Sequence, residues 1–173
     1  MGNAYDDRDG FIWMDGELID WKSANVHILT HAMHYGSSVF EGERAYNGKI
    51  FKSVEHSRRL IQSGEYLDIP NPYNVEEIEQ AKKLVLKKSG LQDAYIRALM
   101  WRGSGEDMGV ASAKNKVRLA IAVWKWGAYY GDAKTKGAIL DISSWKRPSP
   151  ETIPSFAKAA GLYMICTMSK HAA

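Results

Sequence analysis

Apolar and polar residues alternate along the first fifty positions in the manner of short β-strands. The runs 11–19 and 39–51 each carry a turn-forming dipeptide, Asp15-Gly16 in the first and Asn47-Gly48 in the second. These dipeptides tolerate the positive φ angles of a tight turn between two antiparallel strands. The pattern therefore predicts two β-hairpins in the N-terminal part of the chain.

The spacing of apolar residues then becomes helical. Ser53 is a candidate N-cap for a first helix over about 54–67, because a serine hydroxyl can accept a hydrogen bond from the free N–H groups at a helix start. The apolar residues expected on its inward stripe are Leu60, Ile61, Gly64 and Leu67. Their spacing is that of one face of an α-helix, which we expect to be buried.

A second helix is predicted after Pro70 and Pro72. Asn74 and Glu77 stand three residues apart, as in a capping box, and Gly90 suits the position just past a helix C-terminus. The apolar stripe of this helix is expected to consist of Ile78, Ala81, Leu84 and Val85.

Two longer strand-like runs follow, 94–101 and 117–126, separated by a glycine-rich loop over 103–110. Strand alternation in the first run puts Tyr95, Arg97 and Leu99 on one face. Burying an arginine in an apolar strand is costly unless an anion meets it. A substrate carboxylate and a structural glutamate would both satisfy this requirement.

The last quarter of the chain predicts a linker over 127–137, a strand over 138–145 and a buried helix from Ala159 onward. We therefore expect an α+β fold in two parts. Residues 1–127 form a small domain of hairpins and two helices, 128–137 an interdomain linker, and 138–173 the opening strand and helix of a large second domain. About thirty-five residues cannot bury a core of their own, so this second domain is expected to be incomplete.

Composition narrows the classes of partner. The 173 residues carry a net charge of +3, from 23 basic and 20 acidic side chains without a basic block. This balance argues against nucleic acid or a membrane surface as partner, and no apolar run approaches the ~20 residues that span a bilayer. Cys166 is the single cysteine, which excludes an intrachain disulfide. The polar N-terminus is unlike a secretory signal, so a cytoplasmic location is expected.

One lysine stands in an unusual setting. Lys158 lies among small and apolar residues in the segment 152–163. Burial favours the neutral amine of a lysine over its ammonium form, and a neutral amine can attack a carbonyl to form an imine. The alternative is a lysine whose stem packs against apolar neighbours while its head stays in water.

Two other clusters are candidates for binding. A metal site at His31 and His34 would need a third ligand at workable spacing, and no Glu-x-x-His-like partner stands nearby. The alternative is the wall of a pocket, to which Tyr35 and Phe40 offer apolar bodies.

The predicted first helix also carries adjacent arginines, Arg58 and Arg59. Such a pair is most often solvated, but one guanidinium beside the inward Leu60 could hold a phosphate in a cleft.

Five motifs occur along the chain in a fixed order. They are His-Tyr-Gly-x-x-Val-Phe-Glu-Gly (34–42), His-x-x-Arg-Leu (56–60), Tyr-Ile-Arg (95–97), Trp-Gly-Ala-Tyr (126–129) and Ala-Lys-Ala-x-Gly-x-Tyr (157–163). Together they resemble the fold-type IV pyridoxal-phosphate enzymes, and among these the branched-chain amino-acid aminotransferases. The resemblance extends from Trp13 to Lys170.

This resemblance implies a role for each matching residue. Lys158 matches the catalytic lysine that binds pyridoxal 5'-phosphate as a Schiff base and shuttles the substrate proton. Arg59 matches a ligand of the cofactor phosphate, and Tyr163 matches the tyrosine at the cofactor's phenolic oxygen. The residues that match substrate-binding positions are Tyr35, Phe40, Tyr95, Arg97, Val110 and Tyr129.

Two of these positions imply an oligomer. In the family that the chain resembles, the segments matching Tyr35 and the 108–110 loop reach into the neighbouring subunit's site, so a homodimer is implied. The implied reaction is transfer of the amino group of leucine, isoleucine or valine to 2-oxoglutarate.

The rivals are a D-amino-acid aminotransferase, an aminodeoxychorismate lyase and a non-catalytic dimerising fragment. The family's carboxylate partner of the pyridine nitrogen would lie beyond residue 173, so we expect this chain alone to be inactive.

Overall fold

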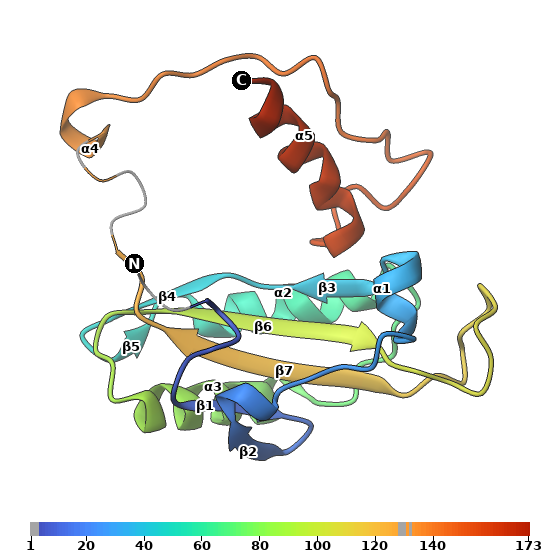
Figure 1. The fold of residues 1–173 in the computed structure, drawn as a ribbon, viewed down its shortest axis with the longest axis horizontal. Helices are drawn as coiled ribbons and strands as arrows, with labels where there is room; N and C mark the ends of the chain where they lie inside the picture. The colour runs from blue at the N-terminus through green and yellow to red at the C-terminus, as the bar shows by residue number, and fades with distance from the viewer. Residues whose placement is uncertain (1–3, 128–130, 132) are drawn as a thin grey trace.

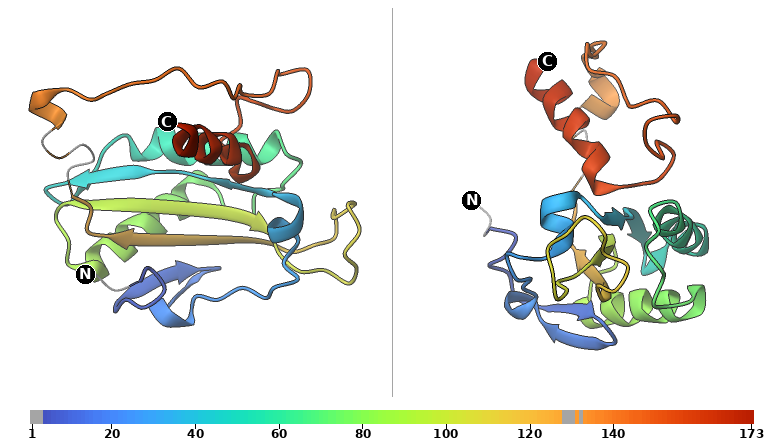
Figure 2. Two further views of the ribbon diagram at one scale, coloured as in Figure 1. Left: turned by 45° about the horizontal axis from the view of Figure 1, so that its top comes forward. Right: turned by 90° about the vertical axis from the view of Figure 1, so that its right-hand side faces the viewer.

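Two helices cover one face of an antiparallel sheet in the computed structural model of this chain, which describes residues 4–127, 131 and 133–173 (Figure 1). The strands are β1 (Phe11–Met14), β2 (Glu17–Asp20), β3 (Ser38–Phe40), β4 (Glu43–Tyr46), β5 (Lys49–Ile50), β6 (Ala94–Arg102) and β7 (Val117–Trp124). The helices are η1 (Trp21–Ser23), α1 (His31–Tyr35), α2 (Ser53–Glu65), α3 (Val75–Ser89), α4 (Ala133–Lys136), η2 (Ala160–Tyr163) and α5 (Met164–Ala172). The helices α2 and α3 lie together on one side of the strands (Figure 2).

The sheet is centred on its two longest strands. Its order is β2-β1-β7-β6-β4-β5, and β3 pairs with β6 beside β4. The pairs Phe40↔Leu99 and Glu43↔Ile96 belong to one continuous antiparallel register. The strands β3 and β4 therefore follow the same edge of β6 one after the other, with residues 41 and 42 at the break between them.

Both hairpin turns form where the sequence predicts them. Asp15 and Gly16 have φ values of 51° and 106°, and Asn47 and Gly48 have 49° and 74°. The first turn joins β1 to β2 and the second joins β4 to β5. The dipeptides succeed as predictors because each turn is a local property of two residues.

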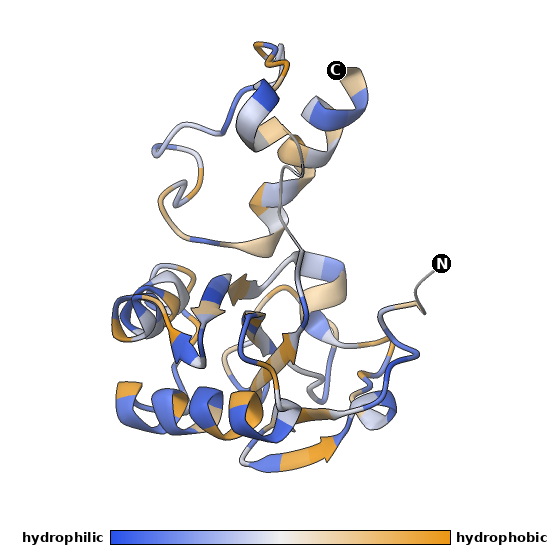
Figure 3. Ribbon diagram, turned by 90° about the vertical axis from the view of Figure 1, so that its left-hand side faces the viewer, coloured by the Kyte–Doolittle hydropathy of each residue, from blue (hydrophilic) through white to orange (hydrophobic). Residues whose placement is uncertain are grey.

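Both predicted helices are confirmed, with two corrections. The capping box of Asn74 and Glu77 begins α3, and Gly90 ends it with a φ of 69°. Ser53 does not cap α2, because its hydroxyl donates to Glu79 on α3, and Lys52 occupies the cap position. On α3, Leu86 is buried in place of the predicted Leu84. Hydrophilic and hydrophobic residues both occur along α3, at the lower left of Figure 3.

The long strand β6 divides its side chains between the two faces as the alternation predicts. Ile96, Ala98 and Met100 are fully buried beneath the helices, in one core with Leu60 of α2 and Ile78 of α3. The half-buried residues Tyr95, Arg97 and Leu99 occupy the opposite face. The sheet therefore presents Arg97 on the side away from α2 and α3.

The C-terminal quarter differs from the sequence expectation. The strand predicted over 138–145 is absent, and Ile139, Leu140 and Ile142 are exposed. A strand forms only beside a neighbour that takes up its hydrogen bonds, and no described strand pairs with this run.

The helix predicted from Ala159 does form, as η2 and α5. The expectation that it is buried is wrong for α5, because none of that helix's residues is buried. It stands clear of the sheet in Figures 1 and 2. None of the helices in the described ranges is both long and apolar enough to cross a lipid bilayer.

Candidate functional site

The segment that carries Lys158 is held against β3 and α2 by its backbone. The N–H of Phe40 donates to the Lys158 carbonyl at 3.1 Å, and the Lys158 N–H donates to Oγ of Ser63 at 3.0 Å. Val39 and Ala159 form an isolated antiparallel bridge. These bonds fix the position of the lysine backbone on rigid elements of the fold.

The amine of Lys158 lies beside two aromatic rings that contact each other. Its Nζ donates to the hydroxyl of Tyr163. It is 4.4 Å from the ring centroid of Phe40 and 4.7 Å from that of Tyr163. The lysine is half-buried and its hydrogen bond to Tyr163 is exposed, so a small molecule can reach the amine.

Arg97 reaches the same phenylalanine from β6. Its guanidinium carbon is 4.6 Å from the Phe40 ring centroid, and its Nη2 donates to the Tyr95 hydroxyl at 3.0 Å. Its Nε is buried without a hydrogen-bond partner. Among the described residues no carboxylate forms an ion pair with Arg97, so the structural-glutamate alternative has no support there.

Gly42 makes room for the tyrosine beside this arginine. A Cβ at position 42 would collide with the hydroxyl of Tyr95. The break between β3 and β4 therefore allows the phenol to lie directly against the backbone, where its oxygen accepts from Arg97.

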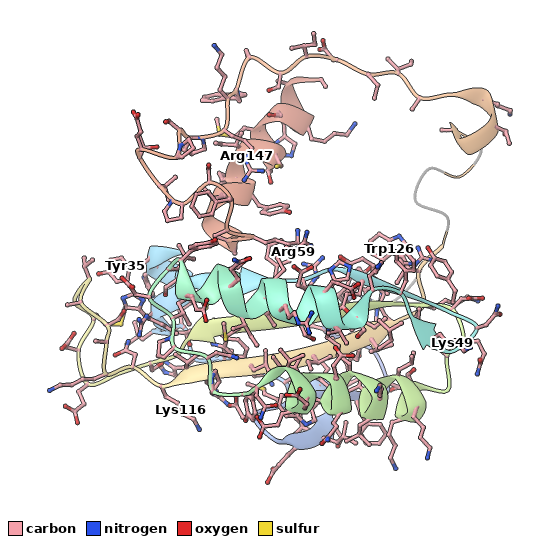
Figure 4. The ribbon with its side chains drawn as sticks, turned by 180° about the vertical axis from the view of Figure 1, so that it is seen from behind. Tyr35, Lys49, Arg59, Lys116, Trp126 and Arg147 are labelled. Atoms are coloured by element: carbon pink, nitrogen blue, oxygen red, sulfur yellow. The ribbon has the colours of Figure 1, made fainter. Side chains whose placement is uncertain are left out.

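Arg59 is tied to a carboxylate for which the sequence pattern alone predicts no role. Glu41, at the break after β3, accepts from Arg59 Nε at 2.5 Å and from Nη2 at 2.7 Å, and its Oε2 lies 2.7 Å from His56 Nδ1. Burial raises the pKa of the Glu41 carboxyl, but the hydrogen bonds and charges of Arg59 and His56 outweigh it, so its pKa lies below the ordinary value of 4.5. Figure 4 shows Arg59 on the side of α2 that faces the C-terminal segment.

The lowered pKa of Glu41 predicts a loss of stability in acid. A group whose pKa is lower in the folded state stabilises the fold fully above its unfolded value, and that contribution is lost as the pH falls through the folded value. We expect the free energy of unfolding to decrease as the pH falls below the ordinary value of 4.5.

Glu79, also with a lowered pKa, adds to this trend, whereas the raised pKa of Glu43 opposes it. The measurement is therefore the difference in urea unfolding between wild type and Glu41→Gln as a function of pH. A constant difference across the acid range would contradict the assignment.

A second cluster of buried charged groups joins β4 to both helices, and the sequence analysis assigns none of its residues a role. Lys82 is fully buried, with its Nζ 2.7 Å from Glu43 Oε1 and 2.7 Å from Ser57 Oγ. Glu79 accepts from Ser57 at 2.7 Å and lies 3.3 Å from Lys82. Burial raises the pKa of Glu43, and the nearby Lys82 only partly offsets it. This cluster has no contact with Lys158 in the structure and holds α2 and α3 on the sheet.

The remaining predicted residues lie elsewhere or outside the description. Tyr35 donates to the Met108 carbonyl at 2.7 Å, so α1 and the 103–110 loop are joined to each other. Tyr35 and Val110 are exposed, and the hydroxyl of Tyr35 bonds to the 103–110 loop rather than to Lys158. Tyr129 lies outside the described residues, as does part of the predicted linker.

The protein has surface pockets on both sides of the sheet. A cavity of about 390 Å³ opens on the face that carries Arg97, and its lining includes Met14, Val26, Met33, Leu99 and Trp101. A larger hollow of about 780 Å³ lies over α2 and the start of α3, away from Lys158. The smaller, apolar one is therefore the hollow that adjoins the candidate site.

The chain is similar to aminotransferases over most of its length. Residues 38–173 match the model of the amino-transferase class IV family. A probable branched-chain-amino-acid aminotransferase of Rickettsia bellii is 44% identical over 160 residues, which are 92% of this chain and 54% of that protein. The branched-chain-amino-acid aminotransferase of Pseudomonas aeruginosa is 40% identical over 163 residues, or 91% of this chain and 53% of that one.

Solved structures give the same picture. The branched-chain aminotransferase of the archaeon Thermoproteus uzoniensis, solved with norvaline, superposes with a TM-score of 0.88 at 30% identity, over 96% of this chain and 56% of that one. The Escherichia coli branched-chain amino acid aminotransferase gives 0.83 at 37% identity, over 92% of this chain and 54% of that one. A third such enzyme, solved with pyridoxamine 5'-phosphate, gives 0.89 at 39% identity, over 96% of this chain and 56% of that one. The chain thus spans about half the length of the relatives it matches.

Proposed function

This chain belongs to the amino-transferase class IV family, and we propose that it supplies the lysine, the phosphate anchor and part of the substrate pocket of a branched-chain amino-acid aminotransferase. The acceptor in this proposal is 2-oxoglutarate and the cofactor is pyridoxal 5'-phosphate. The names of the relatives support the reaction, and one of the similar solved structures contains pyridoxamine 5'-phosphate.

One observation carries the proposal: an amine and an arginine with a free donor meet at one phenylalanine ring. Lys158 Nζ and the Arg97 guanidinium carbon lie 4.4 and 4.6 Å from the centroid of Phe40. An amino acid has an amino group and a carboxylate on the same carbon. A substrate whose carboxylate meets Arg97 would therefore have its α-carbon close to Lys158.

The donor set suits pyridoxal phosphate. A guanidinium fits a phosphate because both can form paired hydrogen bonds. The pKa of Arg59 is raised above its ordinary value, mainly by the hydrogen bond to Glu41 and to a smaller extent by the nearby Tyr163. The hydroxyl of Tyr163, already bonded to Lys158, would face the cofactor's phenolic oxygen. When bound, the cofactor supplies an aldehyde and a ring that withdraws electrons from the substrate α-carbon.

The protein's own contribution is then to bind, orient and move one proton. Lys158 Nζ would take the proton from the substrate α-carbon as a general base. Tyr163 orients that amine through its hydrogen bond, and Phe40 excludes water from one side. Arg97 and Tyr95 would hold the substrate carboxylate. Fixing the substrate in this way lowers the entropic part of the barrier.

Replacing Arg97 tests the assignment of the carboxylate site. In the full-length protein, we expect Arg97→Gln to lower kcat/KM for leucine by about 10- to 100-fold, because a hydrogen bond to a charged group contributes about 1.5–3 kcal/mol. The affinity of the apoprotein for pyridoxal phosphate should not change. The exposed Arg58→Gln is the matched control, and an unchanged kcat/KM in Arg97→Gln would contradict the assignment.

The same assay tests the reaction against its rivals. L-leucine, L-isoleucine and L-valine should be used with 2-oxoglutarate, with preferences limited to about 1–3 kcal/mol per methylene of side chain. Faster use of D-amino acids or lyase activity would assign the protein to another enzyme of the same fold. No turnover with any of them would favour a non-catalytic role.

The assembly and location belong to the same proposal. We expect a cytoplasmic homodimer in which the partner subunit covers α1 and the 103–110 loop. The exposed apolar side chains of Tyr35 and Val110 at this end of the sheet support such an interface. We also propose that residues 1–127 are the small domain, 128–137 the linker, and 138–173 the beginning of the large one.

A further inference from the structure

Glu41, just after β3, and Glu43, the first residue of β4, meet different kinds of cation. The side chains of Glu41 and Glu43 are both completely buried. Glu43 pairs with Lys82, whose side chain is also 0% exposed, so that pair is closed off from solvent. Glu41 pairs with Arg59, whose side chain is 51% exposed. The second pair is therefore closed on the carboxylate side and open on the guanidinium side.

We infer that Glu41 is a positioning residue, which holds the Arg59 guanidinium in the orientation that receives the phosphate of the cofactor. This inference rests on the proposed function, because it takes Arg59 as the phosphate ligand. It adds that the binding competence of Arg59 depends on a buried carboxylate that does not itself touch the cofactor.

The pattern of hydrogen bonds supports this role. Glu41 engages Nε and Nη2 of Arg59, and no described residue forms a hydrogen bond with Nη1. A guanidinium has five N–H donors in a rigid, planar fork. Occupying one edge of the fork therefore fixes the plane of the whole group and leaves donors on the other edge for an anion.

The carboxylate is itself firmly held. The Glu41 backbone N–H donates to the Ala98 carbonyl at 2.8 Å, which continues the β3–β6 pairing. His56, one turn before Arg59 on α2, contacts Glu41 Oε2 at 2.7 Å and lies 3.4 Å from Arg59 Nη2. The N–H of Gly42 donates to the same oxygen at 3.3 Å. Glu41 thus has the fixed geometry that a group needs in order to orient another.

An arginine on a helix surface otherwise samples many rotamers. Binding a phosphate would then require that freedom to be lost at the moment of association, which lowers affinity. Glu41 removes much of the freedom beforehand. The negative charge of Glu41 also repels the phosphate and so opposes binding. In this inference, the gain from orienting Arg59 outweighs that repulsion.

The test compares cofactor forms with and without the phosphate. Apoprotein of the full-length chain is titrated with pyridoxal 5'-phosphate and with pyridoxal. The dissociation constant of pyridoxal divided by that of pyridoxal 5'-phosphate, here called the phosphate ratio, isolates the phosphate contact. We expect Glu41→Gln to reduce this ratio by about tenfold, the lower end of the 10- to 100-fold loss that follows replacement of groups that orient metal ligands. Glu55→Gln, an exposed glutamate on α2, the helix that carries Arg59, is the control and should leave the ratio unchanged.

Arg59→Gln separates this inference from the proposed function. Arg59→Gln should reduce the ratio at least as much as Glu41→Gln, and the double variant should show no further loss, because Glu41 acts through Arg59. A reduced ratio in Arg59→Gln with an unchanged ratio in Glu41→Gln overturns only the positioning role. An unchanged ratio in Arg59→Gln overturns both.

A purely structural Glu41 gives a different result. It would weaken the binding of pyridoxal and pyridoxal phosphate equally, or lower only the melting temperature, and either outcome overturns the inference. If Glu41→Gln does not fold, Glu41→Asp keeps the charge and shortens the side chain. A reduced phosphate ratio in that variant supports the positioning role, and an unchanged ratio overturns it.

Discussion

Lys158→Ala in the full-length protein is expected to lower the rate of transamination by roughly 10³-fold, within the 10²- to 10⁴-fold range of a positioned general base. The amine is held by the backbone bonds of its segment to Phe40 and Ser63 and by the hydroxyl of Tyr163. Removing it takes away the group that would move the α-proton, while the phosphate and carboxylate contacts remain. The measurement is the rate of 2-oxo acid formation from leucine and 2-oxoglutarate under saturating cofactor.

Two controls make this result specific. Lys146→Ala, an exposed lysine in the C-terminal segment, should retain the wild-type rate. Adding a small primary amine to Lys158→Ala should restore part of the activity, because the missing group is an amine at a defined place. A Lys158→Ala protein with more than a tenth of the wild-type rate would show that another group moves the proton.

The largest effect on stability is expected from Lys82→Met. Lys82 is fully buried, forms ion pairs with Glu43 and Glu79, and donates a hydrogen bond to Ser57. Removing the cation leaves the carboxylates of Glu43 on β4 and Glu79 on α3 without their cationic partner. Breaking a buried ion pair in this way typically costs about 3–5 kcal/mol. Urea unfolding of the full-length protein should show the loss. The exposed neighbour Lys83→Met should change the free energy of unfolding by less than about 0.5 kcal/mol.

A second substitution tests the cause of that loss. Adding Glu43→Gln to Lys82→Met removes one of the uncompensated charges and should recover part of the lost stability. The pairwise coupling energy then follows from the double-mutant cycle. If Lys82→Met costs less than about 1 kcal/mol, the buried cluster does not fasten the helices as described.

The elements predicted from the sequence are those set by local chemistry. The turns at Asp15-Gly16 and Asn47-Gly48 and the start of α3 at Asn74 each depend on two or three adjacent residues. The placement of Arg97 follows from alternation along one strand. Lys158 and Tyr163 belong to one motif, and they meet because only five residues separate them.

The features that the sequence does not reveal depend on contacts between elements that are distant in the chain. Lys82 belongs to a polar-looking stretch of α3, and its partner Glu43 is 39 residues away. Glu41 belongs to the motif at 34–42, but the sequence does not reveal its role because its partner Arg59 lies 18 residues later. The strand expected at 138–145 is wrong for a related reason, since apolar residues alone do not form a strand without a neighbouring strand.

The central claim is that the Lys158 amine is the attachment point of pyridoxal phosphate. Treating the full-length protein with pyridoxal phosphate and then borohydride should fix the cofactor to one side chain, and peptide mass spectrometry identifies it. We expect a pyridoxyl group on Lys158, in the peptide that also contains Tyr163. A label on any other lysine, with Lys158 unmodified, would contradict it.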